Sequence, residues 1–169
     1  LGHLWSKNKN RGLYRTTNGG KTWEQVLYID ENTGANEIVI SPTNPQIMYA
    51  SLWEMNPGIS GKNSGVYRSV DGGSTWIKST QGLPAGPKVG RIGLTVSATN
   101  PNKAYALVDN LNYPQGQSAE LYKTLDGGLS WAKTHAGPFP LFTTIGWYFT
   151  DVYVNPKNEK HYTLNANVA

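Results

Sequence analysis

Apolar residues come in short runs along this chain, and polar segments rich in Gly, Pro and Asn separate the runs. Examples are EIVIS at 37–41 and IMYASLW at 47–53. No stretch carries apolar residues at i, i+3, i+4 and i+7 over several turns, so the pattern predicts short strands rather than long helices. The run at 47–53 is apolar on both pleat faces, which is typical of a strand covered on both sides. The pattern therefore predicts an all-β fold.

The strand pattern repeats. Three eight-residue segments combine a turn with a following Trp, and the Asn or Asp at their third position recurs at steps of 53 and 55 residues. A second motif, an Asn-Pro pair at Asn44, Asn100 and Asn155, keeps the same step, with spacings of 56 and 55. Two motifs that share one period indicate a repeat architecture. The turn segments are TTNGGKTW (16–23), SVDGGSTW (69–76) and TLDGGLSW (124–131).

Each period predicts four short strands, which in the middle of the chain are 37–41, 47–53, 65–70 and 74–80. Four strands in a repeat of about 40–55 residues are the signature of a β-propeller blade. The repeats are approximately 1–53, 54–108 and 109–169, so the chain spans about three blades. The register is shifted, so that GHLW at the start and HYTLNAN at the end are both expected to be second strands. Because three blades leave open edges, we expect a larger propeller of 6 to 10 blades or assembly with another copy.

The repeated turn is interpreted as structural. An acid at its first corner, such as Asp71, can accept hydrogen bonds from backbone N–H groups further along the turn. Two glycines tolerate positive φ, and Trp76 supplies a large apolar face. The first copy has Asn18 in place of the acid, and an amide caps a turn but cannot act as a general acid or base. A catalytic role for these acids is therefore disfavoured.

The segments resemble the Asp box, or BNR repeat, of sialidases, sortilin-type (Vps10) propellers and xyloglucanase-type glycoside hydrolases. The wider context is similar to bacterial sortilin/BNR-like glycosyl hydrolase propellers. In that family the box lies on the propeller rim, away from the ligand face. The resemblance implies a structural role for nine residues, with Asn18 and Ser130 departing mildly from the pattern: Asn18, Gly20, Trp23, Asp71, Gly73, Trp76, Asp126, Gly128 and Trp131.

The long, irregular loops are predicted to share the opposite face. In an up-and-down blade the turns between strands one and two and between three and four lie on one side, and the other connections lie on the other side. Long loops on a rigid scaffold commonly carry binding. The loops are 6–11, 28–37, 54–65, 80–90, 110–120 and 135–150, and the candidate ligand-face residues are Trp5, Trp53, Arg91, Tyr113, Trp147 and Tyr148. Alternatively, Trp5 and Trp53 close the ends of inner strands and pack between blades.

Two functions remain open at this point. The first is a non-catalytic extracellular, cell-surface or periplasmic propeller that binds a glycan or protein partner on the loop face. The second is a glycoside hydrolase with two carboxylates at the separation such enzymes need, for which Glu31, Glu54 and Asp109 are the candidates. Sialidase chemistry is disfavoured because the chain has only four arginines, two of them at matching repeat positions, so a hydrolase would be xyloglucanase-like.

Other classes of function are disfavoured. The net charge is +4 with scattered Lys and Arg, so we expect no nucleic-acid partner. No apolar run reaches the roughly 18 residues of a membrane span. With no Cys and three isolated His, neither thiolate chemistry nor a zinc site is expected, and we predict no metal and no cofactor. The chain shows no signal segment at its start, and we interpret it as a piece of a larger protein.

Overall fold

The structure is a computed structural model, and it describes residues 3, 5–55, 57–114, 116–137, 139–142 and 146–165. Parts of several predicted segments lie outside these residues: Gly2, Leu4, Asn56, Gln115, Pro138, residues 143–145 and residues 166–167. The described elements are all strands, as expected. They are β1 (Leu13–Arg15), β2 (Glu24–Leu27), β3 (Thr33–Ile40), β4 (Met48–Glu54), β5 (Gly65–Ser69), β6 (Ile77–Lys78), β7 (Val89–Val96), β8 (Ala104–Asn110), β9 (Ala119–Thr124), β10 (Ala132–Lys133), β11 (Asp151–Val154) and β12 (Tyr162–Asn165).

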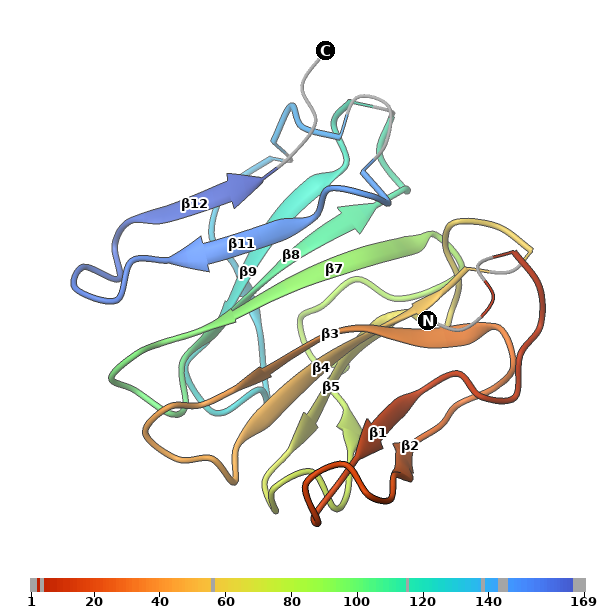
Figure 1. Ribbon diagram of the computed structural model, residues 1–169. Helices are drawn as coiled ribbons and strands as arrows, with labels where there is room; N and C mark the ends of the chain where they lie inside the picture. Colours follow the sequence, from red (N-terminus) through yellow and green to blue (C-terminus); the bar gives the residue numbers. More distant parts are fainter. Residues whose placement is uncertain are drawn as a thin grey trace.

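The strands form two complete blades and two half-blades. Strands β3 to β6 make one four-stranded antiparallel sheet in chain order, and β7 to β10 make a second. Two-stranded sheets flank them, β1–β2 before the first blade and β11–β12 after the second. The four sheets follow one another in chain order around a shared centre (Figure 1), and we call this arrangement the fan. The twelve described strands equal the number in three four-stranded blades, and the four-stranded sheets confirm the prediction of a propeller fragment.

Neighbouring blades meet along their inner strands. The carboxylate of Glu37 on β3 accepts a hydrogen bond from the Leu94 amide of β7 at 2.7 Å. Asn36 donates from its side chain to the Ile92 carbonyl at 3.1 Å. Strand β7 also packs closely against the residue before β11, since a Cβ on Gly93 would lie 2.0 Å from the Thr150 carbonyl oxygen. These contacts place β3, β7 and β11 next to one another at the centre of the fan.

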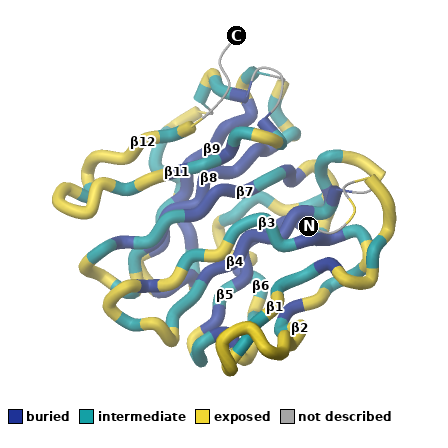
Figure 2. Tube along the Cα trace, in the orientation of Figure 1, coloured by how far each residue is buried: buried dark blue, intermediate teal, exposed yellow. Residues whose placement is uncertain are grey.

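The core lies between the sheets rather than inside one. The largest cluster joins the two complete blades and includes Tyr49, Val66, Leu94 and Trp131. In the two complete blades the second strands are largely buried, with every residue of β8 buried and only the two end residues of β4 partly exposed. This confirms the prediction that the strand at 47–53 is covered on both sides. Exposed residues gather at the two ends of the fan, on β12 and on the hairpin after β1 (Figure 2).

Some predicted boundaries were wrong. Strand β3 begins at Thr33, four residues before the predicted start, and its register shifts between Ala35 and Glu37. Such a bulge breaks the alternation from which strands are predicted. The opening GHLW is not a second strand where it is described, since His3 and Trp5 lie in a bend and a turn. The backbone carbonyls of His3 and Ser6 accept hydrogen bonds from the buried Arg11 guanidinium rather than from a neighbouring strand.

The match of Asn155 with the other Asn-Pro pairs was also wrong. In the first two turns the Asn carbonyl accepts a hydrogen bond three residues on, from Ile47 to Asn44 and from Lys103 to Asn100. In the third turn the equivalent bond runs from His161 to Asn158. Asn158 therefore holds the structural position, and Asn155 occupies the place of Ser41 and Ser97. The Asn-Pro pair at 155–156 therefore lies three residues before the position that matches Asn44 and Asn100, and matching by this pair placed the third turn wrongly.

Candidate ligand face

Each Asp box is closed by hydrogen bonds to its own carboxylate or, in the first copy, to its amide. In the second box, Ser69–Trp76, Asp71 Oδ1 accepts from the backbone amides of Ser74 and Thr75, both at 2.9 Å, and Oδ2 accepts from the Thr75 hydroxyl at 2.6 Å. The Thr75 bonds, followed by one from the Ser69 hydroxyl, hold the pKa of Asp71 well below its usual value. Gly72 and Gly73 have φ of 70° and 82°, which favours glycine.

The first box, Thr16–Trp23, reproduces this arrangement with an amide. Asn18 Oδ1 accepts from the Thr22 amide at 3.0 Å, and the Asn18 amide group donates to the Thr22 hydroxyl at 2.7 Å. In the third box, Thr124–Trp131, Asp126 Oδ1 accepts from the Ser130 amide at 2.9 Å. The same turn therefore forms with Asn or Asp, so it needs hydrogen-bond acceptors rather than an ionisable group.

The boxes lie on the same side as the Asn-Pro turns. Within each complete blade a box glycine amide donates to that turn, from Gly72 to the Gln46 carbonyl at 3.1 Å and from Gly127 to the Asn102 carbonyl at 2.9 Å. These bonds define a short-turn face. The connections from second to third strands leave from the other ends of the strands, and we call that side the loop face.

Aromatic rings gather on the loop face. Trp147 lies in a stack with Trp53, with ring centroids 6.5 Å apart and planes 25° apart, and it meets Trp5 edge-on at 6.0 Å. Tyr148 packs edge-on against Trp147 at 5.8 Å. Trp53 is buried and donates to the Ile59 carbonyl at 2.8 Å, while Trp5 and Tyr148 are more than half exposed. The structure thus joins four of the six predicted ligand-face residues in one cluster.

Asp109 lies in a cavity next to this cluster. The cavity has a volume of about 350 Å³ and is lined by Ile59, Tyr113, Trp147 and Asp109, among others. Asp109 is 2% exposed and accepts a hydrogen bond from the Ser118 hydroxyl at 2.6 Å. Burial raises the pKa of Asp109 to about 6, against the opposing effect of the Ser118 bond. Of the described residues that line the cavity, Asp109 alone carries a carboxylate.

The other two candidate acids lie in different surroundings. Glu54 closes its own loop, because its Oε2 accepts from the Asn63 amide at 2.8 Å. The Glu31 side chain is exposed, and its backbone carbonyl accepts hydrogen bonds from Asn8 and Arg11. Neither acid lines the cavity that holds Asp109.

The other two predicted ligand-face residues are Arg91 and Tyr113. Arg91 forms an ion pair with Asp151 of the next inner strand, with 3.4 Å between Nη2 and Oδ1, and donates to the Tyr148 carbonyl. Tyr113 lines the Asp109 cavity, and the Lys133 ammonium lies 5.7 Å from its ring centroid. Arg91 thus fixes the backbone that carries Trp147 and Tyr148.

Sequence reasoning missed several residues of the site. Ser118 holds the Asp109 carboxyl, and Gly146 lets the chain pass close to it, since a Cβ there would lie 2.9 Å from Asp109 Oδ2. Phe142 is buried beside both, with φ of 67°. A lone Ser or Gly in a loop does not show in the sequence that it contacts an acid elsewhere, because these contacts join separate loops.

Two further features of the described residues bear on function. Their His, Asp and Glu side chains form no group of three or more able to hold a metal ion. No helix among them is long and apolar enough to cross a membrane.

The four-stranded blades, the shared centre and the three boxes define this chain as part of an Asp-box β-propeller. Residues 11–160 match the family described as Sortilin, neurotensin receptor 3 (Sortilin-Vps10). The match spans well over half of the chain, so the chain belongs to this family.

Known proteins show a second likeness. A probable oligoxyloglucan-reducing end-specific xyloglucanase from Neosartorya fischeri is 34% identical over 77 residues, which are 44% of this chain and 9% of that protein. The crystal structure of a GH74 enzyme from Niastella koreensis matches 95% of this chain and 24% of its own length, with a TM-score of 0.68 at 17% identity. A GH74 xyloglucanase from Xanthomonas campestris gives 0.65 at 16% identity, with 95% and 23% covered. The chain therefore spans about a quarter or less of these relatives, and the structural likeness shows the fold.

Proposed function

We propose that this chain is part of an extracellular, cell-surface or periplasmic β-propeller that binds a glycan on its loop face. The observation that carries the proposal is the cluster of Trp5, Trp53, Trp147 and Tyr148 beside the Asp109 cavity. Flat aromatic faces next to hydrogen-bonding groups suit a sugar, whose C–H faces stack on rings while its hydroxyls bond to polar side chains. The relative's printed activity makes xyloglucan oligosaccharides the first probe.

The test is isothermal titration of the chain with xyloglucan oligosaccharides, after a glycan array has given the tightest binder. Trp147→Ala removes the central ring of the cluster and should weaken binding at least tenfold, about 1.4 kcal/mol. Trp23→Ala is the matched control, since Trp23 is an exposed Trp in a box on the short-turn face, and it should leave the affinity per chain unchanged. Equal affinity in the Trp147 variant, or capture of a protein ligand and no glycan by this face, would reject the proposal.

A glycoside hydrolase is the second candidate, and Asp109 is the observation that favours it. A carboxyl group with a pKa near 6 can hold a proton close to neutral pH, as a general acid requires. Hydrolysis needs a second carboxylate, which would come from outside the described lining of the cavity. Release of reducing ends from xyloglucan that stops in Asp109→Asn, with oligosaccharide binding retained, would establish the enzyme. Full hydrolysis in that variant would exclude Asp109 from catalysis.

A further inference from the structure

Asp109 is a buried carboxylate in the wall of a cavity. It lies near the end of β8 and is 2% exposed. Its Oδ1 accepts a hydrogen bond from the Ser118 hydroxyl at 2.6 Å, and its Oδ2 has no hydrogen-bond partner among the described residues. The side chain lines the cavity of about 350 Å³ that Trp147 also lines. One carboxylate oxygen is therefore available to a group that enters the cavity.

Two glycines leave space next to this oxygen. A Cβ on Gly146 would lie 2.9 Å from Asp109 Oδ2, and a Cβ on Gly90 would lie 3.2 Å from it. A side chain at either position would therefore press on the carboxylate and occupy the room beside it. Glycine at both positions keeps that room for a bound molecule.

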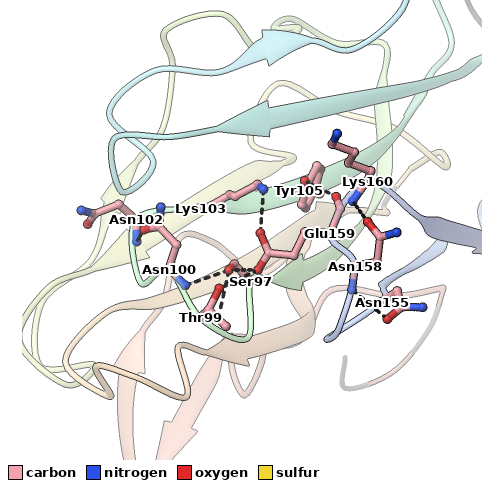
Figure 3. Close-up of polar contacts among 10 residues, drawn as sticks. All are labelled: Ser97, Thr99, Asn100, Asn102, Lys103, Tyr105, Asn155, Asn158, Glu159 and Lys160. Carbon is pink, nitrogen blue, oxygen red and sulfur yellow. Dashed lines mark hydrogen bonds and ion pairs between the residues drawn. The ribbon is translucent and has the colours of Figure 1, made fainter.

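Two other carboxylates with little exposure each have a cationic partner. Glu120 is 1% exposed, and its Oε1 forms an ion pair with the Lys133 ammonium. Glu159, on the third Asn-Pro turn, forms an ion pair with Lys103 at 2.6 Å and also accepts from the Ser97 hydroxyl (Figure 3). In both pairs the positive charge offsets the cost of taking a carboxylate out of water.

Asp109 has no such cation. No ion pair among the described residues includes it, and the described lining of its cavity contains no Lys, Arg or His. The Lys133 ammonium lies 5.7 Å from the ring of Tyr113, which lines the cavity, but it is bound to Glu120. Burial raises the pKa of Asp109 to about 6, so the group is mostly ionised at pH 7. A cation in the cavity would offset the cost of this burial.

The rest of the lining suits a cation carried on a sugar ring. Tyr113, Phe142 and Trp147 line the cavity, and aromatic rings attract a cation that lies over their faces. The cavity volume is near the lower end of the roughly 300–1,000 Å³ of small-molecule sites, which fits one small ring. Trp147 also belongs to the aromatic cluster with Trp53 and Trp5, so neighbouring sugar units can stack outside the cavity.

We propose that the cavity binds an amino-sugar unit of a glycan, with the protonated amino group donating to Asp109 Oδ2. The inference rests on the proposed function, because it names the kind of glycan that the loop face takes. Ser118 keeps its bond to Oδ1, and the sugar ring lies against Trp147. Glucosamine is the simplest such unit, since its amino group replaces one hydroxyl of glucose and carries a positive charge at pH 7. A charge-assisted bond to a buried carboxylate favours it over glucose and over N-acetylglucosamine, whose amide is neutral.

The test is isothermal titration of the chain at pH 7 with three tetrasaccharides of the same β-1,4 linkage: the glucosamine tetramer, its N-acetylated form and cellotetraose. The glucosamine tetramer should bind roughly tenfold tighter than the other two, as expected for a hydrogen bond between charged groups. Asp109→Asn keeps an oxygen for Ser118 but removes the charge, so the affinity for the glucosamine tetramer should fall to that for cellotetraose. Circular dichroism establishes that the variant is folded.

Glu24→Gln is the matched control, since it removes one carboxylate from an exposed side chain of β2 and should keep the preference for glucosamine. Equal affinities for the three tetrasaccharides, or a preference that survives Asp109→Asn, would overturn the inference and leave glycan binding by the loop face standing. A preference lost equally in both variants would also overturn it, because net charge would then account for the attraction. Binding of no glycan at all would reject the proposed function and this inference with it.

Discussion

The guanidinium of Arg68 donates a hydrogen bond to the carbonyl oxygen of Gly127 at 2.9 Å, across the boundary between two blades. Arg15 stands in the same relation to the box of the next blade, with 3.4 Å to the Gly72 carbonyl and 2.9 Å to the Ser74 hydroxyl. The box therefore joins successive blades as well as the third and fourth strands of its own blade.

Arg68→Ala should destabilise the chain by about 1.5–3 kcal/mol, the range for a hydrogen bond to a charged group. Arg68→Lys should lose less, because an ammonium keeps one donor. Urea unfolding measures both, with Lys21→Ala as the control, since Lys21 lies exposed on the tip of the first box. A loss of stability from Arg68→Ala no larger than the control's would show that the contact between the two blades does not depend on this bond.

The box carboxylates should make the fold sensitive to acid. The Ser130 bonds, followed by that from Thr124, lower the pKa of Asp126 to about 2. A lowered pKa adds stability above the unfolded pKa near 4, and this stability is lost as pH falls from about 4 to about 2. Asp126→Asn, which reproduces the amide of Asn18 in the first box, should show a smaller fall in Tm over that interval than the wild-type chain. Parallel Tm curves for the two chains would contradict the carboxylate's role.

Asp109 should act in the opposite direction. Its pKa is raised to about 6 by burial, so the ionised form costs native stability above pH 6 and protonation relieves that cost as pH falls from 6 toward 4. Asp109→Asn should therefore be more stable than wild type by about 1–3 kcal/mol at pH 7.5, and the difference should shrink toward pH 4. Urea unfolding at the two pH values measures this. A difference that does not change with pH would show that Asp109 is not desolvated.

Gly128→Ala should be more damaging than Gly73→Ala. Both glycines have φ near 83°, so each substitution carries a similar backbone strain of about 1–2 kcal/mol. The Gly128 Cβ would also strike the Tyr49 ring at 2.7 Å, whereas the Gly73 Cβ would meet the flexible Met48 sulfur at 3.3 Å. The difference in Tm between the two variants measures the packing of the third box on the preceding blade. Equal Tm values would mean that the box does not pack tightly on the preceding blade.

The repeat made the fold predictable, because each box and Asn-Pro turn uses local hydrogen bonds that the sequence displays directly. Asn18 and Asp71 were assigned to turns from spacing and residue type, and the structure shows both in that role. The start of β3 and the equivalence of Asn158 were not predictable in this way. They depend on a bulge and on cross-turn pairing, which neither periodicity nor a two-residue motif records.

The site was less accessible to prediction. Loop aromatics such as Trp147 and Tyr148 could be selected by type and position. The stacking of Trp147 on Trp53 and the edge-on contact of Tyr148 with Trp147 depend on how the loop folds against β4. The Ser118 bond to Asp109 joins residues nine positions apart, one in β8 and the other just before β9. The raised pKa of Asp109 comes from burial. Asp109 lies near the end of β8, and the sequence does not show whether a residue at a strand end is covered by loops from elsewhere in the chain.

If ligands bind the loop face and the boxes are structural, the six Trp side chains report on both faces. The most direct measurement is a ¹H–¹⁵N spectrum of the indole groups during titration with the glycan that binds tightest. We predict shifts at Trp5, Trp53 and Trp147, with Trp23, Trp76 and Trp131 unmoved. Shifts confined to the three box tryptophans would contradict the claim.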